Sequence, residues 1–347
     1  MRKSSIVVMV CAAAFMLTAG NQALFAQRGG RTADTVVVRI ASPLPRESAW
    51  GRTLDRIAAE WSKITGGQVR LNVLHGGTEG GETQMYRSLT SNTIQAAIFT
   101  TFGMSEIYPP LLTISAPFLI RNQDEFNVVM DEIESDIETR FNAGNYFIVA
   151  WSRAGFVNIF SREPVFTPDD LKGRRIASNA EAAEMNVVFT RMGFSIVEAD
   201  YVDVGPMLAT GQVVAVYQNP AAVAAFQLHN HLRNMLSVNI APVFGGIVIN
   251  QVTWRRIGEL NPNFQQQLVN RTRQIAAELD QSMQKTVSDA ISVMVRDGLT
   301  VNRPSAAQEQ LWFDEIELVN PTLLGTTYDS QLYQRIAEIL ARHRAGR

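Results

Sequence analysis

The sequence predicts an α/β protein built as two lobes, and three observations lead to this fold class. Short apolar runs typical of strands alternate with segments whose apolar residues recur at helical spacing. A segment rich in turn-forming residues, 161–173, separates two sets of these elements. A helical pattern of about 35 residues then begins at Asn261, and a helix of that length would run roughly 50 Å, which exceeds one lobe and predicts that the helix lies along both.

The elements follow one another in a regular order. Val36–Ala41 (VVVRIA) and Val69–Leu74 (VRLNVL) are expected to be strands, and the apolar positions between Leu54 and Trp61 predict a helix that connects them. Met85 lies on the next expected helix. Such alternation is typical of parallel sheets covered by helices. Further strands are expected at Ile94–Phe99, Phe147–Ala150, Arg175–Ala177, Val213–Tyr217 and Gly246–Ile249.

The composition excludes a disordered chain and a nucleic-acid partner. Of the 347 residues, 46% are hydrophobic and the net charge is −2, so the chain can bury a large core. The 31 basic residues are spread along the chain and form no phosphate-binding stripe. We therefore expect a small molecule or a protein as the partner.

The N-terminus has the pattern of a secretory signal peptide. Two basic residues precede an uncharged stretch, Ile6–Gly20, and a short cleavage region ends at Ala26. The uncharged stretch is shorter than the roughly 20 apolar residues that a membrane-spanning helix needs. We expect export and removal of residues 1–26, with cleavage after Ala23 as the alternative.

Cys11, the single cysteine of the sequence, lies inside this leader. The exported chain would therefore contain no disulfide and would depend on its core for stability. Lipid attachment at Cys11 is the alternative, but Val10 occupies the preceding position, where acylation usually requires a small residue. We expect no lipid anchor.

Residues typical of catalytic or metal centres are sparse. His229 and His231 are the only histidines close in sequence, and neither a cysteine nor a carboxylate stands near them at a familiar ligand spacing. A shared zinc ion in an enzyme remains the alternative to a polar surface loop. The glycine-rich stretch 75–82 fits neither the dinucleotide nor the phosphate-loop spacing. We expect no enzymatic activity, no metal and no cofactor.

Six short motifs occur in an order that is shared with a known family. With them, the chain resembles the DctP-type substrate-binding proteins of TRAP transporters. The resemblance implies a type II-like periplasmic binding fold whose two lobes close over a ligand around a hinge. It also implies a periplasmic location, delivery of the ligand to TRAP permease subunits and room for an accessory periplasmic protein. The motifs are Arg39–Pro45 (RIASPLP), Ser48–Gly51 (SAWG), Ile64–Val69 (ITGGQV), Ala116–Leu119 (APFL), Thr167–Gly173 (TPDDLKG) and Leu208–Val213 (LATGQV).

The resemblance and the turn-rich segment together predict the lobe boundaries. Lobe 1 is expected to comprise residues 34–152 and 245–260, and lobe 2 residues 153–244. Residues 261–347 are expected to form C-terminal helices that pack along both lobes.

The resemblance further implies two arginines that pair with a ligand carboxylate, and this chain departs from the family at both positions. Ala177 stands where an arginine follows the Asp-Leu-Lys-Gly motif, and Val157 stands at the second position. A buried carboxylate would lose water there without gaining a bidentate partner. We therefore expect an apolar or amphipathic ligand. The alternative is a carboxylate-binding protein in which Arg153 supplies the cation.

Aromatic, aliphatic and amide side chains are expected around the ligand by their position in the family pattern. For the aromatic residues at strand ends, a place in the core is the alternative. A ligand-sensing periplasmic protein that serves a membrane receptor is a further functional alternative. The expected ligand-binding residues are Trp50, Phe99, Thr100, Phe102, Trp151, Arg153, Val157, Ala177, Tyr217, Gln218, Asn219 and Phe244.

Overall fold

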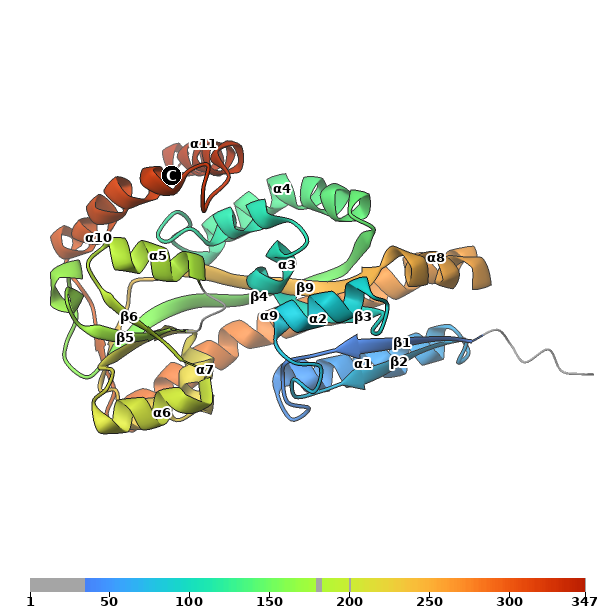
Figure 1. Cartoon of the computed structure of the whole chain (residues 1–347), viewed down its shortest axis with the longest axis horizontal. Helices are drawn as coiled ribbons and strands as arrows, with labels where there is room; N and C mark the ends of the chain where they lie inside the picture. Colours follow the sequence, from blue (N-terminus) through green and yellow to red (C-terminus); the bar gives the residue numbers. More distant parts are fainter. Residues whose placement is uncertain (1–34, 179–182, 200, 347) are drawn as a thin grey trace, which may run out of the picture. The chain divides into compact units, whose positions relative to one another are not determined.

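A mixed β-sheet runs through the computed structural model, which describes residues 35–178, 183–199 and 201–346 (Figure 1). The strand order is β2-β1-β3-β9-β4-β7-β5-β6, with β8 paired to β4 and β10 paired to β8. The predicted signal peptide and Cys11 lie outside the described residues. The strands are β1 (Val36–Ala41), β2 (Val69–Leu74), β3 (Ala96–Thr100), β4 (Tyr146–Ser161), β5 (Arg175–Ser178), β6 (Ser195–Glu198), β7 (Ala215–Gln218), β8 (Asn234–Leu236), β9 (Ala241–Asn250) and β10 (Thr300–Asn302).

Helices surround the sheet, and each described helix is too short or too polar to cross a membrane. The α-helices are α1 (Ala49–Ile64), α2 (Glu82–Thr90), α3 (Thr101–Ser105), α4 (Gln123–Ala143), α5 (Ala183–Arg191), α6 (Tyr201–Thr210), α7 (Pro220–Ala225), α8 (Gln251–Leu260), α9 (Pro262–Arg296), α10 (Ala306–Val319) and α11 (Ser330–Ala345). Short 3₁₀ helices include η1 (Pro109–Ser115), η2 (Pro168–Leu171), η4 (Leu228–Asn230) and η5 (Asn320–Leu323).

Two groups of parallel strands are joined by antiparallel strands. β1 pairs in parallel with β2 and β3, and β5 pairs in parallel with β6 and β7. Between the groups, β9 runs antiparallel to β3 and β4, and β4 runs antiparallel to β7. The sheet is therefore mixed, whereas the alternating sequence pattern predicted parallel strands.

The strands β4 and β9 are the elements that connect the two parallel groups. β4 is longer than the expected strand Phe147–Ala150, and β9 is longer than Gly246–Ile249. The apolar run in β4 is broken by polar residues and by Gly155, although the backbone stays paired through a register shift between Arg153 and Phe156. A register shift of this kind bends a strand locally, which suits a connection between lobes.

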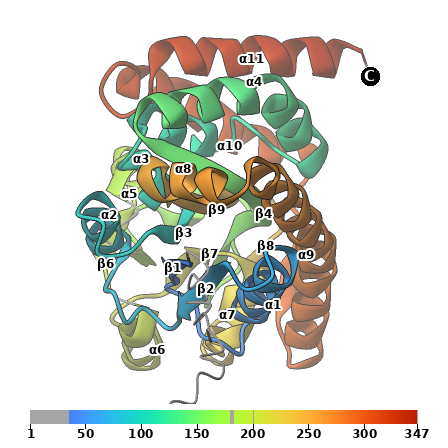
Figure 2. The same ribbon diagram turned by 90° about the vertical axis from the view of Figure 1, so that its right-hand side faces the viewer.

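The long helix α9 packs along both parts of the sheet, as the sequence predicted. It contacts α1 and α8 beside β1 and β4, and it contacts α7 near the second group of strands (Figures 1 and 2). The buried Trp61 of α1 donates from Nε1 to Thr272 Oγ1 at 2.8 Å. Pro262 stands in the first turn of α9, and the side chain of Asn261 caps the N-terminus of α9. These two residues explain why the helix begins there.

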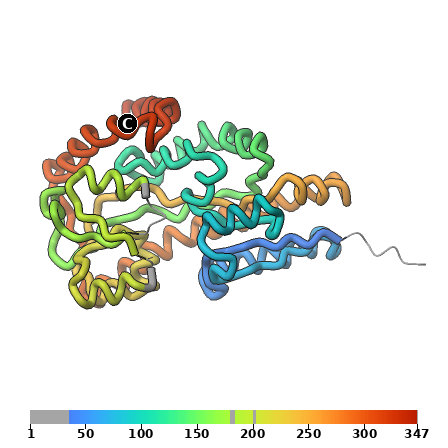
Figure 3. Tube along the Cα trace, viewed as in Figure 1, coloured from blue at the N-terminus to red at the C-terminus, as the bar shows by residue number. Residues whose placement is uncertain are grey.

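The C-terminal helix α11 lies against α4, so the two elements meet although they are far apart in the sequence (Figure 3). Ion pairs join Arg335 to Asp136 at 2.5 Å and Arg342 to Glu132 at 2.7 Å. The C-terminal segment thereby packs on α4, and the loop at 325–329 lies beside η1 and α5. The expected lobe boundaries remain a prediction.

Candidate functional site

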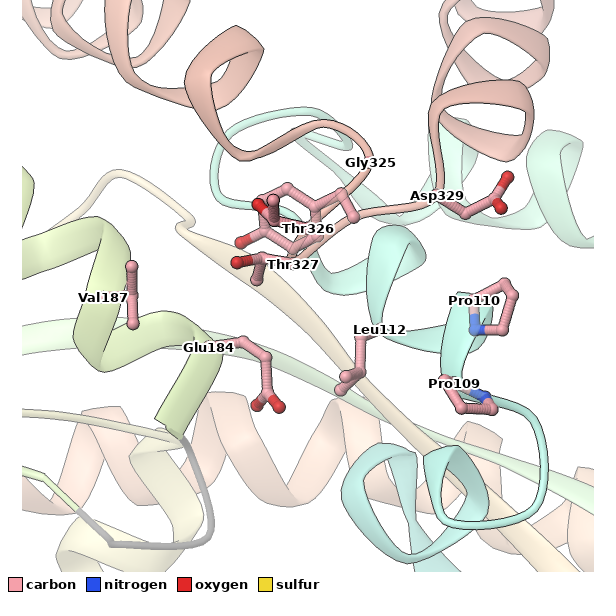
Figure 4. A pocket seen from close by; sticks show the side chains of 10 residues that line it. Pro109, Pro110, Leu112, Glu184, Val187, Gly325, Thr326, Thr327 and Asp329 are labelled. Atoms are coloured by element: carbon pink, nitrogen blue, oxygen red, sulfur yellow. The ribbon is translucent and has the colours of Figure 1, made fainter.

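A pocket of about 490 Å³ opens between η1 and α5 (Figure 4). This volume lies within the range of small-molecule sites. Three separate segments line it: η1, α5 and the loop that connects η5 to α11. The lining residues are Pro109, Pro110, Leu112, Glu184, Val187, Gly325, Thr326, Thr327, Tyr328 and Asp329.

Glu184 is the acidic side chain that projects from the first turn of α5 toward η1 (Figure 4). Its Oε2 atom is buried without a hydrogen-bond partner. Burial raises the pKa of Glu184 above its usual value; a hydrogen bond from the backbone N–H of Glu184 itself acts against this rise, and the negative charge of Glu106 adds to it. The pocket therefore holds a carboxylate whose negative charge is poorly compensated in this structure.

The second carboxylate at the pocket, Asp329, already has a structural role. Asp329 is the N-cap of α11, and its Oδ1 accepts a hydrogen bond from the Leu332 N–H at 2.8 Å. The remaining lining residues are neutral, and none of the described side chains around the pocket is basic. The pocket thus combines apolar surface with negative charge.

Tyr328 connects the pocket to the edge of the second group of strands. Its side chain is buried, which raises the pKa of its phenol, and the charges of Glu184 and Tyr217 act in the same direction. Tyr217, at the end of β7, lies 2.6 Å from Ser178 Oγ and donates to Asn186 Oδ1 at 3.1 Å. The predicted residue Tyr217 is therefore in electrostatic reach of the pocket.

Three of the predicted residues share a small cavity at the ends of β5 and β7. Ala177, Tyr217 and Gln218 line this cavity of about 20 Å³ together with Ala199, Val204 and other residues. Ala177 is only 2% exposed. The cavity holds little more than a water molecule, so these side chains lie close together but enclose no ligand-sized space here.

Thr100 and Phe102 lie where β3 ends and α3 begins. Thr100 is exposed, whereas Phe102 is half-buried against the core. The buried carboxylate of Glu82 accepts hydrogen bonds from the Thr100 N–H at 3.1 Å and the Gly103 N–H at 2.7 Å. These hydrogen bonds fix the turn between β3 and α3. The glycine-rich stretch 75–82 therefore ends at Glu82, a residue that is anchored to this turn.

Four other predicted residues are held in the core. Trp50 packs beside Leu54 and Phe99 lies in the large cluster, with 8% and 2% of their surfaces exposed. The rings of Trp151 and Phe244 lie 6.4 Å apart and are tilted by 40°, and Trp151 Nε1 donates to Glu138 Oε1 at 3.2 Å. Phe99 and Phe244 therefore have the surroundings of core residues, which was the alternative to a ligand-binding role for aromatic residues at strand ends.

Arg153 and Val157 lie on β4. The Arg153 guanidinium donates to Asn127 Oδ1 at 2.8 Å and lies 3.7 Å from Glu134 Oε2, and both partners belong to α4. Val157 is half-buried against the core. Neither residue lines the pocket between η1 and α5. A role for Arg153 as a ligand clamp remains a prediction, and it would require the guanidinium to leave these partners.

The side-chain amide of Asn219 binds to the backbone of β4, the strand that connects the two groups of parallel strands. Its Nδ2 donates to the carbonyl oxygens of Ala154 at 2.8 Å and Phe156 at 3.3 Å, and its Oδ1 caps α7 through the Ala221 N–H. Between these carbonyls, Gly155 adopts a φ of +89°, a conformation that favours glycine. Asn219 therefore holds the bent part of β4 in place.

The two histidines that are close in sequence lie in and directly after η4. His229 is buried, and its Nε2 lies 3.4 Å from Asp297 Oδ2, while His231 is exposed. No group of three or more metal-ligating side chains gathers among the described residues. His229 thus belongs to the short helix η4 and is buried, whereas the sequence favoured a polar surface loop for both histidines.

None of the residues that line the larger pocket was expected from the sequence. Pro109, Glu184 and Tyr328 are far apart in the chain and belong to no motif. Their only signal is indirect, because Glu184 follows shortly after β5, at the expected ligand-facing end of a parallel strand. The role of the loop 325–329 depends on how the C-terminal helices pack, which local patterns do not reveal.

The sequence profile of the DctP family, described as bacterial extracellular solute-binding protein, family 7, matches residues 40–322. A solute-binding protein of Chromohalobacter salexigens is 26% identical over 173 residues, which cover 49% of this chain and 51% of that protein. The match thus spans about half the length of this relative. The 2,3-diketo-L-gulonate-binding periplasmic protein of Escherichia coli is 24% identical over 282 residues, covering 73% of this chain and 84% of the relative.

Solved structures share the fold. A TRAP periplasmic solute-binding protein from Xanthobacter autotrophicus with bound β-D-galacturonate superimposes with a TM-score of 0.74. The alignment covers 88% of this chain and 99% of that chain at 17% identity. The bilobed α/β fold expected from the sequence is confirmed by this similarity.

Proposed function

Because the chain belongs to the DctP family of bacterial extracellular solute-binding proteins, we propose that it captures a small molecule between its lobes and delivers it to a TRAP permease in the membrane. The pocket between η1 and α5 is the proposed capture site, since it is the ligand-sized cavity that touches elements of both expected lobes.

The proposed ligand has apolar surface and no carboxylate. The observation that carries this proposal is the lining of the pocket. Proline, leucine, valine and tyrosine side chains stand there beside a glutamate whose buried Oε2 has no hydrogen-bond partner, and no described lining residue is basic. A carboxylate would lose its water and meet a like charge there. An apolar ligand instead gains about 25 cal/mol for each Å² that it buries.

A second candidate is a carboxylate ligand held by Arg153. This candidate is favoured by the two relatives described above, whose names record 2,3-diketo-L-gulonate and β-D-galacturonate, both sugar acids. It requires the Arg153 guanidinium to leave Asn127 and Glu134. The hydrogen bond to Asn127 and the ion pair with Glu134 would then be lost. We therefore place it second.

Calorimetric titration separates the two candidates. The purified protein is titrated with galacturonate, succinate and malate, and in parallel with uncharged apolar compounds of six to ten carbon atoms. We expect no heat of binding from the acids and measurable binding of at least one uncharged compound. Micromolar binding of any of the acids, lost on Arg153→Ala, would instead establish the second candidate.

A further inference from the structure

We propose that the pocket binds an organic cation, meaning an amine, ammonium or guanidinium group carried on an apolar body, and that Glu184 pairs with its positive charge. This inference rests on the proposed function and narrows its ligand class from compounds without a carboxylate to compounds with a positive charge. Three features of the pocket lead to it.

The first feature is the unused acceptor. Glu184 extends from α5 into the space beside Leu112 (Figure 4), and its buried Oε2 has no hydrogen-bond partner in the described structure. Buried carboxylate oxygens are normally satisfied, because an unpaired one loses hydration without compensation. A ligand with a charged N–H group or an ammonium would supply the missing partner.

The second feature is the sign of the surrounding charge. Glu106 is the charged side chain that acts on Glu184, and it adds negative potential. Glu106 ends α3 three residues before Pro109, so it belongs to the η1 side of the pocket, whereas Glu184 belongs to α5. Closure of the lobes would bring the two carboxylates nearer to each other. A cation between them turns this repulsion into attraction, which favours the closed form with ligand bound.

The third feature is the apolar remainder of the lining. Pro109, Pro110, Leu112 and Val187 offer hydrocarbon surface to the body of the ligand, and Tyr328 adds an aromatic residue. Aromatic rings beside carboxylates are a common environment for organic cations, because the ring face and the carboxylate both attract positive charge. The combination distinguishes this pocket from a metal site, for which the described residues provide too few oxygen ligands.

Three probes of nearly equal size and different charge test the inference: 2-phenylethylammonium, 2-phenylethanol and phenylacetate. Calorimetry with the purified protein at low ionic strength should show the cation binding at least tenfold more tightly than the alcohol, and the anion most weakly. Glu184→Gln should weaken binding of the cation at least tenfold and leave the affinity for the alcohol within twofold of the wild-type value. Glu338→Gln, which changes an exposed glutamate of α11, is the matched control and should change neither the affinity for the cation nor the affinity for the alcohol.

The outcomes distinguish this inference from the proposed function. If the alcohol binds as tightly as the cation, or if Glu184→Gln keeps the cation preference, the inference is wrong and the proposed function stands. If phenylacetate binds most tightly, both are wrong. Absence of binding by all three probes also overturns the inference, since the pocket then shows no affinity for a cation. Thermal unfolding of each variant without ligand verifies that the substitutions leave the fold intact.

Discussion

Ala177 stands at a position where the family resemblance implies an arginine. Its side chain is 2% exposed and packs with Val204, Leu208 and Val216 in the core of the second strand group. An arginine at this position would need space that the adjoining cavity of about 20 Å³ does not provide. The position therefore belongs to the packing of this lobe as much as to the cleft.

Ala177→Arg should lower the free energy of unfolding by about 2–4 kcal/mol, because it adds bulk and an unpaired charge to a packed site. Denaturant unfolding measures this effect. Ser195→Arg, on the exposed face of the neighbouring strand β6, is the control and should stay within about 0.5 kcal/mol of the wild type. Unchanged stability of Ala177→Arg would show that this site is open to the cleft.

Asp280 is an ionisable residue at the bent part of β4. It belongs to α9, and its Oδ1 accepts a hydrogen bond from the Arg153 N–H at 3.0 Å. Burial raises the pKa of Asp280 from 3.8 to about 6. The folded state thus binds this proton more tightly than the unfolded chain does. The stabilisation from the proton is complete below about pH 3.8 and is lost as the pH rises through about 6.

Asp280→Asn keeps the acceptor oxygen and removes this titration. The variant should exceed the wild type in free energy of unfolding by about 1–2 kcal/mol at pH 7.5, a figure discounted for partial solvent exposure. The advantage should shrink as the pH falls through about 6 and disappear only below about 3.8, where the folded and the unfolded wild type are both protonated. Denaturant unfolding of both proteins at several pH values measures it. A difference that stays constant with pH would exclude Asp280 as the titrating group.

At the scale of single elements, α9 packs on α1 through one buried polar contact, while the ion pairs Arg56–Glu278 and Arg271–Glu60 lie at more exposed parts of the same interface. Trp61 and Thr272 are 2% and 0% exposed, and the hydrogen bond between them satisfies the indole N–H. Thr272 Oγ1 also donates to the Leu268 carbonyl oxygen within the helix. Removing the hydroxyl would leave the indole donor buried and unpaired.

Thr272→Val should therefore lower the free energy of unfolding by about 1–3 kcal/mol, although the two side chains have the same shape. Thr286→Val is the matched control. Thr286 makes the same type of bond, to the Ser282 carbonyl oxygen, but is exposed, so its loss should cost less than about 0.5 kcal/mol. Equal effects of the two substitutions would contradict a role for the buried contact.

The elements differ in how far the sequence predicts them. β1, β2 and α9 follow from uninterrupted apolar periodicity, and their observed bounds agree with the expectation. The lengths of β4 and β9 did not follow, because Arg153 and Gly155 interrupt the apolar pattern while the backbone pairing continues. Pairing between distant strands leaves no local signal, so the antiparallel connection of the lobes was also missed.

At the scale of the whole protein, the candidate site illustrates the same limit. The family motifs predicted the strand ends near Thr100, Ala177 and Tyr217, and the structure brings Ala177 and Tyr217 together. The larger pocket also needs the loop 325–329, which is held beside η1 by a hydrogen bond from the Asp329 N–H to Thr113 Oγ1 at 3.0 Å. Residues supplied by such long-range packing are absent from any local pattern.

Closure of the lobes is a prediction at the scale of the whole described chain. We expect the bent part of β4, held by Asn219 and Asp280, to act as the hinge, so that rotation there brings α5 toward η1. Ligand binding should shift the population toward the closed form. Small-angle scattering of the protein purified with its bound molecule should give a smaller radius of gyration than the same protein after unfolding, removal of the molecule and refolding. Equal radii would argue against closure.

The ligand class is tested most directly by identifying the molecule that the protein itself retains. The protein is purified under native conditions from cells that produce it, its bound molecule is released by denaturation, and mass spectrometry identifies that molecule and its molar ratio to protein. We expect about one equivalent of a compound with an apolar body, a positively charged group and no carboxylate. A sugar acid or a dicarboxylate present at one equivalent would contradict the account.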